Sequence, residues 1–200
     1  QQAHSWLKRL GNQTLVITLL ADNSLRDKKQ YNYLGDRAGM LRFRKKGENL
    51  EPDWSIVEKI LNAYNGDVGT PKFLVFQVWT QVLYGVRTKH APKNMPAPDE
   101  VEVPVTLVNE DGTLSVARIK PPYMDEHKAL WKKIFDGLYR QMEKQGWPKD
   151  ILVIGSGADG RPRKQTAEAF RKLATDRWVV FSHGRGLAMP EEHDKPLILG

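Results

Sequence analysis

The sequence contains no cysteine, which excludes disulfide bonds, thiolate nucleophiles and cysteine-ligated metals. Hydrophobic residues make up only 40% of the 200 residues, and no run approaches the roughly 20 apolar residues that a membrane-spanning helix needs. We therefore expect no membrane partner. The chain begins at Gln1, without an initiator methionine or a signal peptide, so we expect it to have been processed or cut from something longer.

The formal net charge of +7 would suit a nucleic-acid partner if the basic residues were gathered together. Lysine and arginine are instead scattered among aspartate and glutamate. The densest basic cluster lies within residues 42–46 and is soon followed by Glu48 and Glu51. We therefore expect no nucleic-acid partner. Six tryptophans, six tyrosines and six phenylalanines supply large side chains for a core.

Four short apolar runs rich in β-branched residues predict strands that are buried on both faces. They span residues 14–21, 72–79, 151–155 and 178–182. Runs of this kind are typical of a parallel sheet.

Helices are predicted between these strands, at about residues 55–65, 126–144 and 163–175. Ser55 and Glu58 have the spacing of a capping box at the start of the first helix. Gly146 and Pro148 are stop signals for the second helix. The apolar stripe of this second helix comprises Leu130, Trp131, Ile134, Phe135, Leu138, Tyr139 and Met142.

The resulting order, β-α-β-α-β-α-β, predicts an α/β fold with a parallel sheet. Two strand-to-helix connections are long. Residues 22–53 include a possible short strand at 40–44, and residues 80–125 include a hairpin of 101–108 and 114–119. Both follow the carboxyl ends of strands, where α/β folds build their sites. Four strands would make half of an eight-stranded barrel or a small open sheet, and the order alone does not decide between them.

Several segments, in order, resemble barrel segments of bacterial glycoside hydrolase domains related to glycoside hydrolase family 123. They are residues 40–47, 53–60, 71–79, 130–138 followed by 146–148, and 155–162, so that the resemblance covers most of residues 13–185. It implies that residues 1–200 form a single, incomplete (β/α) barrel of the TIM type, with loop insertions at 22–53 and 80–125. The remainder of the barrel would come from a longer chain. It also implies a carbohydrate substrate, an N-acetylhexosamine-containing glycan. Nothing in the sequence requires a cofactor or a metal, and we expect neither.

Enzymes of this family remove N-acetylgalactosamine with the substrate's own acetamido group as nucleophile, and an adjacent Asp-Glu pair assists. The Asp orients the acetamido group and the Glu is the general acid/base. By this resemblance Asp159 is the candidate for the Asp, but Gly160 follows it, so the pair lacks its acid. A replacement acid could come from Glu126, at the start of the long predicted helix, or from outside the chain. Asp159 could equally cap the helix that follows it.

Substrate-binding residues are expected in the same loops. Trp79 and Tyr84 could stack on sugar rings, and His183 could bind a hydroxyl or transfer a proton. Asp22 follows the first strand, and Arg161 lies beside Asp159. The alternatives are that Trp79 belongs to the core and that His183 is a structural histidine.

Two other functions remain open. Gly155, Gly157 and Gly160 match the dinucleotide-binding pattern G-x-G-x-x-G between a strand and a helix. Asp159 would, however, bring negative charge close to a pyrophosphate, and the next strand does not end in the acidic residue that holds a ribose. The other alternative is a non-catalytic carbohydrate-binding or interaction domain, which the missing acid favours.

Overall fold

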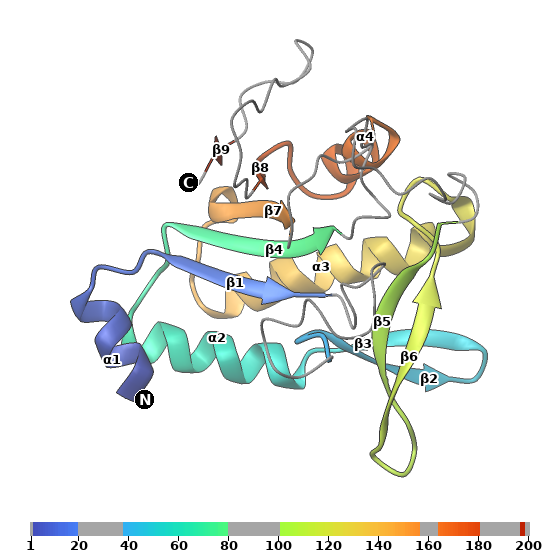
Figure 1. Ribbon diagram of the computed structural model, residues 1–200, viewed down its shortest axis with the longest axis horizontal. Helices are drawn as coiled ribbons and strands as arrows, with labels where there is room; N and C mark the ends of the chain where they lie inside the picture. The colour runs from blue at the N-terminus through green and yellow to red at the C-terminus, as the bar shows by residue number, and fades with distance from the viewer. Residues whose placement is uncertain (1, 20–37, 80–100, 157–163, 181–196, 199–200) are drawn as a thin grey trace, which may run out of the picture.

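The computed structural model describes residues 2–19, 38–79, 101–156, 164–180 and 197–198. These residues form two β-sheets and four α-helices (Figure 1). Side chains from both sheets and from three of the helices share one main hydrophobic core. None of the described helices is long and apolar enough to cross a bilayer.

The first sheet, called sheet A, has five parallel strands whose spatial order follows the chain. They are β1 (Thr14–Thr18), β4 (Phe73–Trp79), β7 (Leu152–Ser156), β8 (Trp178–Val180) and β9 (Leu197–Ile198). The four predicted strands and their parallel pairing are confirmed, and β9 is an addition. Within the described residues the strands do not close into a barrel, so the confirmed part of the prediction is an α/β fold with a parallel sheet.

Three helices cover one face of sheet A. They are α2 (Ser55–Asp67), α3 (Lys128–Lys144) and α4 (Lys164–Leu173). Successive side chains of a strand point to opposite faces. Ile17, Phe76 and Ile154 accordingly lie in the core with the helices, whereas Val75 and Val153 are buried on the other face of the sheet. A fourth helix, α1 (Gln2–Arg9), contacts α2 and was not predicted.

Helix α3 has the buried face that its apolar stripe predicts, with Tyr139 half-buried at its border. The helix ends as the sequence indicates. Gly146 adopts a left-handed φ of 71° and donates its N–H to the Glu143 carbonyl, while the Trp147 N–H reaches the Met142 carbonyl. This pair of bonds is a Schellman motif, which satisfies carbonyls that the helix end would otherwise leave unpaired.

Aromatic rings join α3 to the elements on either side of it. The Phe135 ring lies 5.8 Å from Phe76 of β4 and 5.6 Å from Phe170 of α4, both edge to face. Trp131 meets Phe170 at 5.4 Å, also edge to face. Edge-to-face pairs at these centroid distances stabilise a core beyond the area they bury.

The start of α2 differs from the prediction. Trp54 occupies the N-cap position without a side-chain bond, and Ser55 is the first helical residue. The Asp53 carboxylate accepts the Ser55 N–H at 3.0 Å, and Glu58 pairs with Lys144 of α3 at 3.0 Å. The predicted capping box is therefore wrong, because an acidic residue two positions earlier takes the free N–H and α3 supplies another partner for Glu58.

The second sheet, called sheet B, has the order β3-β2-β5-β6. Its strands are β2 (Arg42–Lys46), β3 (Asn49–Asp53), β5 (Val103–Val108) and β6 (Leu114–Ile119). The predicted β5–β6 hairpin is confirmed, the short strand predicted at 40–44 lies at 42–46, and β3 was not predicted. Strands β2 and β5 pair in parallel, so the two long connections unite in one sheet.

Sheet B is attached to the carboxyl end of β1. The Thr18 carbonyl accepts the Met40 N–H at 2.8 Å and the Leu41 N–H at 3.2 Å. The Gly39 N–H then donates to the buried Thr106 hydroxyl of β5 at 2.7 Å. These bonds place the insertions beside the edge at which the strands of sheet A end.

We expect the substitution Gly137→Ala in α3 to destabilise the protein. A Cβ at Gly137 would lie 2.5 Å from the Trp54 indole, so the packing would have to shift, which costs about 1–3 kcal/mol. Gly66 of α2 is exposed and has open space around it, so Gly66→Ala should instead stabilise the helix by about 0.5–1 kcal/mol. Urea denaturation measures both changes. Two changes of the same sign would contradict the proposed packing of Trp54.

We also expect acid-sensitive stability from Asp53. Burial raises the pKa of this carboxyl, but hydrogen bonds from Ser55 and Arg44 outweigh burial and leave the pKa below 3.8. A lowered folded-state pKa contributes stability above the unfolded value, and this stability is lost as the pH falls through the folded value. Asp53→Ala should lower the free energy of unfolding by about 1 kcal/mol at neutral pH and flatten its decline below about pH 4. Denaturation at several pH values tests this, with exposed Asp176→Ala as the control that keeps the wild-type profile.

Candidate functional site

The carboxyl ends of four strands of sheet A lie side by side. In the last row that crosses all four strands, Thr18 of β1 pairs with Gln77 of β4, and Gln77 pairs with Gly155 of β7. Gly155 pairs in turn with Val179 of β8. Because all four strands are parallel, the segments that follow them leave the sheet at one common edge (Figure 1).

All but one of the predicted site residues follow this edge closely in the sequence. Trp79 is the last residue of β4, and its backbone pairs with Ser156. The others, Asp22, Tyr84, Asp159, Arg161 and His183, come within five residues of a strand end but lie outside the described residues, so their positions stay predictions.

Strand β4 is irregular at this edge. Gln77 pairs with Gly155 and Trp79 with Ser156, so Val78 is one extra residue in β4. Bulges of this kind are frequent at the rims of barrels and beside active sites, where they change the direction of a strand end. The bulge lies directly before the segment that contains Tyr84.

Glu126, the predicted replacement acid, lies in the 3₁₀ helix η2 (Asp125–His127) before α3. Figure 1 shows α3 beginning on the side of the molecule toward which β1 and β4 point. The Glu126 side chain is 62% exposed, whereas the general acids of glycosidases are commonly held in apolar surroundings. Glu126 is therefore a weak candidate for the acid.

His127 has a structural role instead. Its Nδ1 atom accepts the Lys120 N–H at 3.1 Å, so this nitrogen carries no proton in the observed arrangement. The Glu126 carboxylate lies 3.7 Å from the same Nδ1 atom but receives no hydrogen bond from it, because that atom is itself an acceptor. Trp131 donates its indole N–H to the Lys120 carbonyl at 2.8 Å. Together these bonds hold the end of β6 against the start of α3.

Gly155 has a packing reason for being glycine. A Cβ at this position would overlap the Cγ1 methyl of Val75, which lies on the neighbouring strand β4, two residues before Gln77. The first glycine of the dinucleotide-like pattern is thus explained without a bound phosphate. Dinucleotide-binding sheets also reverse their strand order beside the ligand, and sheet A shows no such reversal within its described strands.

Sequence reasoning passed over one residue of this edge, Thr18. Its side chain is only 6% exposed, and its hydroxyl oxygen is buried without a hydrogen-bond partner. The signal in the sequence is a polar residue inside the apolar run 14–21. Threonine is so common in strands that this signal could not single it out.

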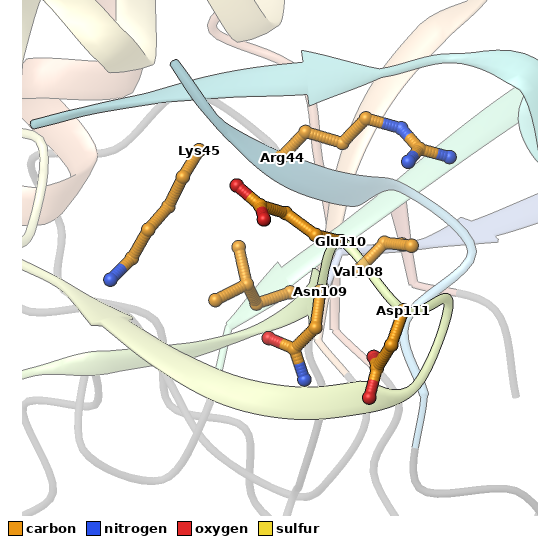
Figure 2. A pocket seen from close by; sticks show the side chains of 7 residues that line it. Arg44, Lys45, Val108, Asn109, Glu110 and Asp111 are labelled. Carbon is orange, nitrogen blue, oxygen red and sulfur yellow. The ribbon is translucent and has the colours of Figure 1, made fainter. Parts of the chain in front are cut away.

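A separate hollow of about 530 Å³ opens on sheet B between β2 and the β5–β6 turn (Figure 2). Its lining comprises Arg44, Lys45, Leu107, Val108, Asn109, Glu110 and Asp111. Most of its polar groups are already engaged. Hydrogen bonds from the Thr113 hydroxyl and backbone lower the pKa of Asp111, the Asn109 amide also donates to Thr113, and Arg44 pairs with Asp53 at 2.7 Å. The hollow therefore belongs to the architecture of the turn.

Within the described part of the chain, no group of three histidine, aspartate or glutamate side chains could hold a metal ion.

Comparisons with known proteins find a likeness in fold. No family profile matches the sequence, and no curated protein matches it. A solved structure does match, that of a family 123 glycoside hydrolase from Clostridium perfringens, described for glycolipid glycan hydrolysis. The TM-score is 0.56 at 15% sequence identity, over 92% of this chain and 30% of the hydrolase. The chain thus spans under a third of that enzyme, with which it shares a fold.

We expect NADP to leave the melting temperature unchanged. A ligand at about 100 times its Kd stabilises a folded protein by about 2.7 kcal/mol, so true binding would be visible in a thermal-shift titration. We expect no NADP binding because sheet A has no reversal of strand order within its described strands and because Gly155 is required for packing against Val75. A saturable rise with NADP, lost in Gly157→Ala, would restore the dinucleotide alternative.

Proposed function

We propose that this chain binds carbohydrate at the carboxyl-terminal edge of sheet A, as one part of a (β/α) barrel of the glycoside hydrolase type. The observation that carries the proposal is the strand order of sheet A. Parallel neighbours that follow the chain, with helices on one face, are the arrangement found in a barrel wall. The likeness in fold to a family 123 glycoside hydrolase supports the same interpretation.

The insertions support the location of the site. Barrel enzymes build their sites from the loops at the carboxyl ends of the strands. Here the connections after β1 and β4 are the long ones, and they form sheet B beside that edge. The bonds from Met40 and Leu41 to Thr18 keep sheet B next to the proposed site, where it would serve as a wall.

We assign the chemistry of the site from the residues that follow the strands. Asp159 would orient the reacting or bound sugar, and Trp79 and Tyr84 would stack against its rings. His183, Asp22 and Arg161 would hydrogen-bond its hydroxyl groups. An N-acetylhexosamine is the sugar that the family resemblance favours.

Hydrolysis needs an acid in addition. Gly160 stands where the family has its acidic residue, and Glu126 is largely exposed. The proposal is therefore carbohydrate binding by this chain, with catalysis depending on an acid from the rest of a longer barrel. Within the described residues no further strand pairs with the outer edges of β1 and β9, and such edges readily take up strands from a longer chain.

The first test is a thermal-shift and calorimetric titration with N-acetylgalactosamine and N-acetylglucosamine. Wild-type protein should bind at least one of them, and Asp159→Asn should abolish the binding without lowering the melting temperature of the free protein. Asp150→Asn is the matched control. Asp150 is exposed and lies in the 3₁₀ helix η3 (Lys149–Ile151), at the amino end of β7, so this change should leave binding intact.

Two results would count against the proposal in different ways. Normal binding by Asp159→Asn would remove Asp159 from the site but leave the carbohydrate function standing. Absence of binding to every sugar tested would contradict the carbohydrate function.

A further inference from the structure

Thr18 is an unusual last residue for a buried strand. The side chain is 6% exposed, and its Oγ1 atom has no hydrogen-bond partner in the structure. Buried hydroxyl groups nearly always have a partner, since an unpaired one loses its bonds to water without replacement. A buried group without a partner therefore calls for an explanation, and a ligand that supplies the missing bond is one.

The hydroxyl stands on the face of sheet A opposite to the helices. Ile17 and Leu19, on either side of Thr18, belong to the core beneath the helices. Strand side chains alternate between faces, so Thr18 shares the opposite face with Val16. Val16 packs there against Val75 and Val153, both fully buried.

Thr18 belongs to a row of residues at the carboxyl ends of three strands. It pairs in register with Gln77 of β4, which pairs with Gly155 of β7, so all three lie on this same face. The Gln77 side chain is half-buried. Thr18 and Gln77 thus present a hydroxyl and a carboxamide from adjacent positions of one face, and Gly155 beyond them adds no side chain.

The backbone holds this row firmly. The Thr18 carbonyl accepts two N–H groups, from Met40 and Leu41, and the Leu19 N–H donates to the Gln77 carbonyl at 3.1 Å. Strand residues that are fixed in this way hold their side chains with little freedom, which favours binding because less motion is lost when a ligand arrives.

The surroundings of the row suit a neutral polar ligand. The side chains that share this face in β1, β4 and β7 carry no charge: Thr14, Val16, Thr18, Phe73, Val75, Gln77 and Val153. The cations recorded at this face, Lys72 and Arg177, lie over the Phe73 ring at the amino end of β4, four residues before Gln77. A sugar presents hydroxyl groups together with apolar C–H surface. The hydroxyl groups could bond to Thr18 and Gln77, and the C–H surface could contact the valine side chains next to them.

We propose that the Thr18 hydroxyl and the Gln77 carboxamide form hydrogen bonds to the hydroxyl groups of a sugar at this edge. The Thr18 hydroxyl can donate one bond and accept others, and the Gln77 amide does both, so the pair can bind two neighbouring sugar hydroxyls. This assignment rests on the proposed carbohydrate function and names two binding residues that the loop motifs do not contain.

The test is Thr18→Val, which keeps the shape of the side chain and removes only the hydroxyl. No hydrogen bond within the protein is lost, so the melting temperature of the free protein should stay the same or rise. The affinity for N-acetylgalactosamine or N-acetylglucosamine, whichever the wild type binds, should fall about tenfold in calorimetry, as expected for one lost hydrogen bond. Thr18→Ser, which keeps the hydroxyl, should bind within about twofold of wild type.

Thr166→Val is the matched control. Thr166 of α4 is also fully buried with a hydroxyl that has no partner, but it lies in the helical layer. Thr166→Val should change the melting temperature of the free protein as Thr18→Val does, and it should leave the sugar affinity unchanged. Gln77→Met, which keeps the length of the side chain and removes the amide, tests the second residue and serves if a Thr18 variant fails to fold.

The outcomes separate the two proposals. Wild-type binding that survives both Thr18→Val and Gln77→Met would overturn the role of this row and leave the carbohydrate function intact. A lower melting temperature for Thr18→Val, restored in Thr18→Ser, would overturn it as well, because the hydroxyl would then be structural. Absence of sugar binding by the wild type would overturn the proposed function, and the assignment of Thr18 and Gln77 with it.

Discussion

The apolar face of α3 is the surface on which the other layers rest. Phe135 packs against β4 of sheet A, and with Trp131 it surrounds Phe170 of α4. The same helix contacts sheet B, through the Trp131 bond to Lys120 and through the approach of Trp54 to Gly137. Burial of each large side chain of this face contributes about 1.5–3 kcal/mol. Helix α3 thus joins sheet A, sheet B and α4 in one core.

This packing has a consequence for the opposite face of sheet A. Helices occupy one side, so the strands present Val75, Val153 and the Thr18–Gln77 row on the other. In a closed barrel that second face would be the interior. The described parts of the two insertions unite as sheet B at the end of β1 and pack with the helices in the main core. The fold therefore brings the two long connections to the edge that we propose binds sugar.

Much of the regular structure could be predicted, because it depends on periodicity within short segments. The apolar stripe of α3 and the apolar runs of β1, β4 and β7 each indicate their structure without reference to other residues. Strand β3 escaped prediction because residues 49–53, which include Pro52, lack a strand pattern and form a strand by pairing with β2. The capping box of α2 was mispredicted because Asp53 accepts the Ser55 N–H and Lys144 pairs with the Glu58 carboxylate. The Glu58 carboxylate therefore does not bond the Ser55 N–H.

For the candidate site, the sequence by itself determined which edge of sheet A the proposed residues follow, because parallel strands must send the segments after them to one side. It also supplied Asp159 and the aromatic residues as candidates. Only the tertiary structure singled out Thr18 and placed it beside Gln77, since whether a hydroxyl has a partner depends on neighbours from other strands and not on its own segment. Tertiary structure likewise decided the meaning of Gly155, whose missing side chain makes room for Val75. Helix and strand patterns depend on neighbours along the chain, whereas hydrogen-bond partners and close side-chain packing depend on neighbours in space.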